Sequence, residues 1–244
     1  MIKVFIIGLI ILFITLISMF LRSKTTNNIE GIKITKIFPK EEDNMLNIKQ
    51  RQEKLKYLGF YKGNVDGLTG PLTRKAYRDL QNKYFFRRKD KDGLYGPNTE
   101  KLLLNAYNVK KYTKNFDLKR DRLYCHCKGK YCTGYPAVMS PELLTEMQNV
   151  RNKYGPVTVN SMMRCRIHNR NVGGISNSKH MKGQAADIKN RKIILTYDRT
   201  KKFIDEEIEK PAIQYAYTDG YGRTKTRTTY PKARGMRKSI HINI

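Results

Sequence analysis

Apolar residues are arranged very differently in the first twenty residues and in the rest of the chain. Residues 4–21 form an uncharged run of 18 residues, interrupted only by one glycine, one threonine and one serine. As a helix rising about 1.5 Å per residue, this run would span about 27 Å, close to the ~30 Å hydrocarbon core of a bilayer. It ends without the small residues of a signal-peptide cleavage site. The pattern therefore favours an uncleaved transmembrane anchor over residues 1–21, followed by a stalk over residues 22–44.

Helical spacing of apolar residues recurs in three stretches, near residues 46–58, 72–80 and 102–106. Between these stretches lie two copies of one eight-residue pattern, 26 residues apart, which read DGLTGPLT at residues 66–73 and DGLYGPNT at residues 92–99. In each copy Asp-Gly is a turn signal, and Gly-Pro places a proline at the first position of a following helix. Residues 45–108 are therefore predicted to form a small unit of three helices with two similar turns.

From residue 116 to residue 244, helical spacing alternates with short strand patterns. Helices are predicted over residues 141–153 and 199–209. Strands are predicted over residues 157–163, 185–188, 212–218 and 239–244, and the last of these alternates apolar and polar residues with period 2. Helices beside a small, mainly antiparallel sheet make an α+β domain. Residues 109–115 are the predicted linker between the two units.

The charge balance is strongly basic: Lys and Arg number 49 against 21 Asp and Glu, a formal net charge of +28. A chain this basic prefers polyanions, which include nucleic acids, anionic membranes and anionic cell-wall polymers. The basic residues are spread along all segments and no nucleic-acid-binding motif occurs, so a specific nucleic-acid partner is disfavoured. Attraction to anionic wall polymers is the favoured interpretation, and a lysine-rich surface that is merely well solvated is the alternative.

Two of the four histidines fall in patterns that suit metal binding. Residues 178–187 read SKHMKGQAAD. His180 and Asp187 converge if Gly183 allows a turn and residues 185–188 then form a strand. A neutral imidazole and a carboxylate suit Zn²⁺, with a third ligand and an open position left for water. His241 lies in the predicted C-terminal strand, on the face opposite Ile240 and Ile242. Taken singly, each histidine is more often an ordinary structural residue.

The four cysteines form an even set, and two interpretations of them stay open at this point. If the domain lies outside the membrane, two disulfides are the natural expectation, one of them joining the 125–132 loop to the cysteine further along the chain. The alternative is free thiols or a structural metal site, although the C-x-C-x-x-x-x-C spacing departs from the usual C-x-x-C. The cysteines concerned are Cys125, Cys127, Cys132 and Cys165.

The stretch LKYLGFYKGNVDGLTGPLTRKAYRDLQ, together with the two DGxxGPxT turns, resembles the peptidoglycan-binding domain found on many cell-wall hydrolases. The resemblance covers residues 45–108. It implies that the turns are scaffold, that the groove they shape binds a glycan-peptide, and that peptidoglycan is the partner of this unit.

The stretch VNSMMRCRIHNRNVGGISNSKHMKGQAADI resembles the zinc D-alanyl-D-alanine carboxypeptidase family, which includes VanY-type enzymes and phage endolysin peptidases. The resemblance extends to the C-terminus and includes the SxHxxGxAxD core. It implies that His180, Asp187 and His241 bind zinc. It also implies that Arg164, in the S-x-x-R position, is catalytic and binds the substrate's carboxylate or polarises the scissile carbonyl. Ser178 is the further substrate-binding residue it implies.

The implied activity is zinc-dependent hydrolysis of peptidoglycan stem peptides, by a protein anchored through its N-terminal span with the enzymatic part on the cell-wall side. The general acid/base departs from the family pattern. Lys238 stands where many members have Glu or Asp, and Met236 stands where another branch has histidine. His168 and Asp219 are spare candidates for that role. The alternative is a catalytically weakened wall-binding pseudoenzyme that holds the stem peptide without cleaving it.

Overall fold

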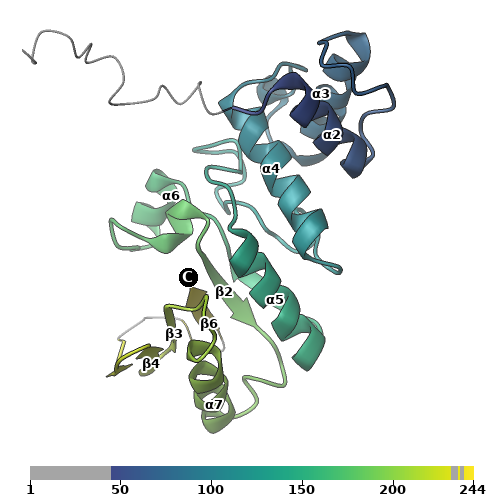
Figure 1. The fold of residues 1–244 in the computed structure, drawn as a ribbon. Coiled ribbons are helices and arrows are strands. Elements are labelled where there is room, and N and C mark those ends of the chain that lie inside the picture. The colour runs from purple at the N-terminus through teal and green to yellow at the C-terminus, as the bar shows by residue number, and fades with distance from the viewer. Residues whose placement is uncertain (1–44, 232–235, 237–238) are drawn as a thin grey trace, which may run out of the picture. The chain divides into compact units, whose positions relative to one another are not determined.

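In the computed structural model, three helices come first and a sheet with its own helices follows (Figure 1). The structure describes residues 45–231, 236 and 239–244. The first group comprises α2 (Ile48–Leu58), α3 (Pro71–Tyr84), the short 3-10 helix η3 (Arg88–Asp90) and α4 (Pro97–Tyr112). The second comprises α5 (Pro141–Tyr154), β1 (Thr158–Ser161), α6 (Arg166–Asn171), η4 (Lys179–Lys182), β2 (Ala185–Lys189), α7 (Tyr197–Ile208), β3 (Tyr215–Thr218), β4 (Tyr221–Thr224), β5 (Thr228–Thr229) and β6 (Ile240–Asn243).

The predicted membrane anchor is not supported by the structure. Within the part of the chain that the structure describes, no helix is long and apolar enough to cross a membrane. The longest helix there, α4, has 16 residues, whereas a span needs about 20 apolar ones. The predicted span, residues 4–21, and the predicted stalk, residues 22–44, lie outside the described residues. The expected fold class and localisation are corrected on this point, and a membrane partner through an N-terminal helix has no support.

The repeated turns are built as their sequence predicts. Gly67 and Gly93 have φ of +79° and +76°, the left-handed region that glycine adopts without steric cost. Helices α3 and α4 then begin at Pro71 and Pro97, whose missing N–H groups would have no partner in a first helical turn. The predicted three-helix unit is confirmed.

A buried glutamine fastens each turn to the helix before it, a feature that the sequence pattern did not reveal. The side-chain amide of Gln52 donates to Asp66 Oδ1 at 2.7 Å and to the Leu68 carbonyl oxygen at 3.0 Å, and its Oε1 accepts from the Gly67 amide at 2.9 Å. Gln81 makes the equivalent three bonds to the second copy, at 2.7–3.1 Å. The two turns are therefore equivalent in hydrogen bonding as well as in sequence.

The strands form one six-stranded antiparallel sheet in the order β1-β2-β6-β3-β4-β5. The C-terminal strand β6 lies in the middle, between β2 and β3, and helix α7 packs on β3 and β4. The predicted α+β domain with a mainly antiparallel sheet is confirmed. Strands β4 and β5 and helix α6 were not predicted.

The two groups of elements share one hydrophobic core within residues 45–244. Helices α4 and α5 pack on each other, and Asn105 on α4 is hydrogen-bonded to the chain before α5. Its amide donates to the Ala137 carbonyl oxygen and its Oδ1 accepts from the Met139 amide, both at 2.8 Å. Helix α4 also continues through residue 112, into the predicted linker. The domain boundaries remain a prediction.

Candidate metal centre and its cleft

His180 is held on η4 with one ring nitrogen already occupied. The residue is buried, and its Nδ1 lies 2.7 Å from the Met162 carbonyl oxygen. A carbonyl oxygen only accepts, so Nδ1 carries the ring proton and Nε2 keeps its lone pair. That Nε2 lies 3.3 Å from Asp187 Oδ1. This is the arrangement in which a neutral histidine binds a metal through one nitrogen and is oriented through the other.

The turn predicted at Gly183 brings His180 back beside β2. Gly183 ends η4 with φ of +69°, and a Cβ at this position would lie 2.2 Å from the Val138 carbonyl oxygen. Any other residue would therefore meet backbone that cannot move aside easily. The glycine allows the chain to reverse between His180 and Asp187.

Sheet register places His241 directly opposite Asp187. The two residues are paired across β2 and β6, and His241 Nδ1 lies 2.8 Å from Asp187 Oδ1. On the other side β6 pairs with β3, where Tyr217 is the partner of His241, and the centres of the two rings lie 4.6 Å apart with their planes inclined at 30°. The Asn243 side-chain nitrogen lies 3.3 Å from His241 Nε2. The imidazole is therefore fixed by neighbours on both sides.

The structure thus brings together the three residues predicted to bind metal. Ligand atoms of His180, Asp187 and His241 all lie within 4.8 Å of one another, and all three side chains are buried. Two imidazole nitrogens and one carboxylate oxygen are donors that suit zinc. The cluster could hold a metal ion.

The protonation states in this cluster are those that metal ligation requires. Burial alone would raise the pKa of Asp187, but its interactions with the neighbouring His180 and His241 side chains outweigh burial and hold that pKa well below its usual value. Burial lowers the pKa of His241, against the raising effect of Asp187. The carboxylate is therefore ionised and the His241 imidazole neutral at neutral pH.

Arg164 follows β1 and reaches the same carboxylate. One guanidinium N–H donates to Asp187 Oδ2 at 2.6 Å, and Nε donates to the Ser161 hydroxyl at 2.9 Å, so both polar ends of the S-x-x-R pattern are in contact. The Arg164 backbone amide also donates to the His180 carbonyl oxygen at 3.1 Å. These bonds fix the guanidinium beside the candidate metal ligands.

A cleft of about 780 Å³ opens over the cluster. Ser178, which precedes η4, lies in its wall with Arg164, and the substrate-binding role of both residues stays a prediction. Sequence reasoning missed Tyr215 and Tyr217, although their spacing of two places both on the β3 face next to His241. The described residues of the lining are Arg164, Val172, Gly173, Gly174, Ile175, Asn177, Ser178, Lys179, His180, Asp187, Tyr215, Tyr217, Pro231, Met236, His241 and Asn243.

The candidates for proton transfer are less well placed. Asp187 is the one carboxylate among the described residues that line the cleft, and Met236 also lines it. His168 and Asp219 are not among the lining residues. Lys238 lies outside the described residues.

The structure gathers all four cysteines at one point, away from the lining of this cleft. They are free thiols, and their sulfur atoms all lie within 4.8 Å of one another. The structure therefore has the free-thiol arrangement that the sequence left open beside two disulfides, and it brings the four residues together as one group instead of two pairs. They are Cys125, Cys127, Cys132 and Cys165.

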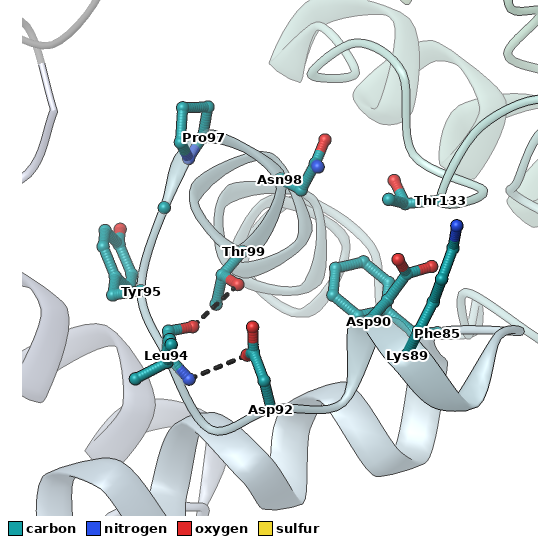
Figure 2. Close-up of a pocket in the computed structure, with 11 residues that line it drawn as sticks. Phe85, Lys89, Asp90, Asp92, Leu94, Tyr95, Pro97, Asn98, Thr99 and Thr133 are labelled. Atoms are coloured by element: carbon teal, nitrogen blue, oxygen red, sulfur yellow. Dashed lines mark hydrogen bonds between the residues drawn. The ribbon is translucent and has the colours of Figure 1, made fainter.

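A smaller hollow, of about 190 Å³, lies at the second copy of the repeated turn (Figure 2). Asp92 accepts there from the Leu94 amide at 2.8 Å, and the Thr99 hydroxyl donates to the Leu94 carbonyl oxygen at 3.1 Å. Its other polar lining residues are Lys89, Asp90, Tyr95, Asn98 and Thr133. Its hydroxyl, amide and carboxylate groups suit hydrogen bonding to a small polar ligand.

Comparison with known proteins finds relatives for both parts of the chain. Residues 44–103 match a putative peptidoglycan binding domain, and residues 116–205 match peptidase M15. A zinc D-Ala-D-Ala carboxypeptidase of Streptomyces albus G is 32% identical over 132 residues, 51% of this chain and 49% of the relative. The M15 family and this relative imply Zn²⁺ as the cofactor, and the His180–Asp187–His241 cluster is a candidate site for it.

Two further relatives match a shorter stretch of the chain. A spore cortex-lytic enzyme of Bacillus cereus is 42% identical over 64 residues, 26% of this chain and 24% of the relative. The spore cortex-lytic enzyme of Oceanobacillus iheyensis is 33% identical over 78 residues, 32% of this chain and 27% of the relative. The chain therefore spans half the length or less of the curated relatives it matches. A stretch that matches a peptidoglycan-binding domain is thus followed along the chain by a stretch that matches peptidase M15.

Proposed function

We propose that the protein is a zinc-dependent peptidase that hydrolyses stem peptides of peptidoglycan in the manner of a D-Ala-D-Ala carboxypeptidase. The observation that carries the proposal is the convergence of His180, Asp187 and His241 within 4.8 Å, at the base of a cleft that Arg164 also lines. The M15 match and the zinc carboxypeptidase relative support the same reaction class.

The three candidate ligands fit zinc by their donor atoms and by their protonation. His180 offers Nε2 because Met162 occupies Nδ1, and Asp187 offers an ionised oxygen. Three protein ligands leave a fourth position for water or substrate, which is the pattern of catalytic zinc sites. Bound zinc would lower the pKa of a water molecule toward about 7 and stabilise negative charge on the scissile carbonyl oxygen.

Arg164 would fix the end of the substrate. Its guanidinium is permanently charged and matches the two oxygens of a terminal carboxylate. In a peptide, only the C-terminal residue lies between that carboxylate and the last peptide bond. Neighbouring Cα atoms are about 3.8 Å apart, so the two groups are close to each other. Arg164 contacts Asp187 directly, at 2.6 Å, so a peptide bound there would present its last amide bond to the metal ligands. This geometry favours the release of a single C-terminal residue.

Tyr217 would act as a proton or hydrogen-bond donor in the cleft. Burial raises the pKa of its hydroxyl to about 12, so the side chain is protonated at neutral pH. A protonated phenol can donate to the developing oxyanion or to the leaving amine, and it cannot serve as a base. The tyrosine lies beside His241, which places it next to the reaction centre.

The N-terminal three helices would hold the enzyme on its polymeric substrate. Their match to a peptidoglycan-binding domain supports this role, and the net charge of +28 adds attraction to anionic wall polymers. The electrostatic part is screened by salt. We expect retention on isolated cell walls to weaken as salt is raised; retention unchanged at high salt would contradict the contribution of charge.

The test is mass spectrometry of defined muropeptides incubated with the full chain, with added zinc, with a chelator, and with His180→Ala in place of the native protein. Loss of one alanine, dependent on zinc and on His180, is the expected result. Lys182→Ala, on the exposed side of the same short helix, is the matched control and should cleave normally. Intact peptides despite bound zinc would contradict the proposal.

A further inference from the structure

We infer that Cys125, Cys127, Cys132 and Cys165 bind a second, structural metal ion of the thiophilic divalent class, zinc. This ion would join the irregular loop of residues 125–134 to the segment that carries Arg164. The inference does not rest on the proposed peptidase activity, because it concerns a separate group of residues and is tested by metal content.

The positions of the sulfur atoms favour one shared ligand. All four lie within 4.8 Å of one another, and the Cys127 and Cys132 sulfurs are 3.4 Å apart. Zinc bound tetrahedrally by four thiolates at about 2.3 Å separates its sulfurs by about 3.8 Å. Two disulfides would need only two close pairs, whereas here every sulfur is close to the other three. A single ion explains this arrangement and disulfides do not.

Backbone amides point at three of the sulfurs, as they do around metal-bound thiolates. The Cys165 amide donates to Cys125 Sγ at 3.3 Å, the Gly134 amide to Cys132 Sγ at 3.4 Å, and the His168 amide to Cys165 Sγ at 3.5 Å. Such bonds stabilise negative charge on sulfur and orient the ligands of a metal. They come from both chain segments that contribute cysteines.

The loop itself is folded so that its three sulfurs face one point. Lys128 and Gly129 both have positive φ, +48° and +89°, and the Cys125 amide donates to the Gly134 carbonyl oxygen at 2.8 Å. A positive φ is an unfavourable backbone conformation for lysine, so another interaction must offset its free-energy cost. Bonds from the three cysteines of this loop to one ion would provide that stabilisation.

The chain on either side of this loop also lacks helices or strands that would stabilise the loop. Residues 113–140, all described, contain no helix or strand. An irregular segment of this length inside a folded unit is uncommon without a function or a cross-link. Cys165, which caps α6 and follows Arg164, would tie this segment to the wall of the cleft. Four protein ligands leave no open position, so the ion would stabilise the fold and take no part in hydrolysis.

The first experiment measures zinc per chain in the full protein, purified with reductant and dialysed against buffer without free metal. We expect two zinc ions for the native chain, one for His180→Ala and one for Cys132→Ser. Lys130→Ala, an exposed change in the same loop, is the matched control and should keep two. One ion in the native chain and none in His180→Ala would overturn the inference.

The second experiment replaces zinc with cobalt and records the absorption spectrum. Thiolate-to-cobalt charge transfer marks sulfur ligation, and the His180–Asp187–His241 cluster has no sulfur. We expect this band in the native chain and, undiminished, in His180→Ala. Because His180→Ala keeps all four cysteines, the result stands even if Cys132→Ser fails to fold. Absence of the band, or a mass of the unreduced protein showing disulfides, would overturn the inference.

Discussion

The two clusters of potential metal ligands in this chain are built in opposite ways. His180, Asp187 and His241 provide three ligand atoms, lie in the wall of a cleft of about 780 Å³, and have Arg164 beside them. The four cysteines provide four ligand atoms, and none of them lines that cleft. A metal with three protein ligands keeps a position for substrate, while one with four is closed. The number of ligands and their access to the cleft thus separate a site for chemistry from a site for stability.

The two clusters also differ in the secondary structure that carries them. Asp187 and His241 are fixed by direct pairing of two central strands of the sheet, so their geometry does not depend on a bound ion. Three of the cysteines lie on a loop that has no regular hydrogen-bond ladder. We therefore expect loss of ligands from the first cluster to remove activity with little unfolding, and loss from the second to do the reverse.

The largest effect is expected from Asp187→Ala. The change removes the anionic ligand and leaves the Arg164 guanidinium without the carboxylate that it contacts. Loss of metal-based charge stabilisation costs several kcal/mol, so kcat/KM for a muropeptide should fall by about a thousandfold or more. Zinc content should fall by one ion. Asp198→Ala, a change of an exposed aspartate, is the control. Activity retained in Asp187→Ala would show that the three-ligand cluster is not needed for hydrolysis.

Cys132→Ser should have the opposite profile. Since metal binding contributes to folding where the site lies on an irregular segment, the free energy of unfolding should fall by several kcal/mol. Thermal or denaturant unfolding of native and variant chains measures the change. Under conditions where the variant is folded, kcat/KM should fall far less than in Asp187→Ala. A free energy of unfolding equal to the native value in Cys132→Ser would show that the cysteine group does not stabilise the fold.

Arg164→Lys changes a residue that is next to both clusters: Arg164 contacts Asp187 of the first cluster and directly precedes Cys165 of the second. Lysine keeps the charge but cannot make the paired bonds to a carboxylate that arginine makes. We expect KM to rise about tenfold or more, in keeping with loss of a charged hydrogen bond of about 1.5–3 kcal/mol. Zinc content should stay at its native value. Steady-state kinetics on peptides with a free or an amidated C-terminus make the check, because only the free acid should lose affinity.

The sequence predicted the first cluster far better than the second. The SxHxxGxAxD pattern, the turn at Gly183 and the alternation around His241 are local signals, and sheet register then brings them together. Three of the cysteines lie within residues 113–140, which contain no helix or strand and so have no such period, and no local signal indicates that Cys165 lies beside them. Strand β5 was missed because it has only two residues, and β4, which reads YGRT, was missed because its sequence has no clear alternation of apolar and polar residues.

The buried glutamines of the repeated turns show a further limit. Gln52 precedes the aspartate of its turn by 14 positions and Gln81 by 11, so they are out of register with the 26-residue repeat. On a helix, a glutamine also looks like an exposed polar residue until its partners are known. The turns were therefore predictable, and the bonds that fasten them were not.

The smallest effect is expected at Asn243, and it sharpens the contrast in how each cluster is supported. If His241 binds metal through Nδ1, which faces Asp187, then Nε2 must carry the ring proton and needs an acceptor. The Asn243 side-chain nitrogen lies 3.3 Å from Nε2, and turning that amide by 180° would present its oxygen as the acceptor instead. Around the cysteines the corresponding support comes from backbone amides, which truncation of a side chain does not remove. Asn243→Ala should therefore weaken zinc binding by about tenfold, in the usual range for partners of metal ligands. Asn243→Asp, a stronger acceptor, should restore or exceed native affinity, an ordering that a purely structural role would not produce. Competition with a chromogenic chelator measures both; equal affinities in all three chains would show that the sheet alone orients His241.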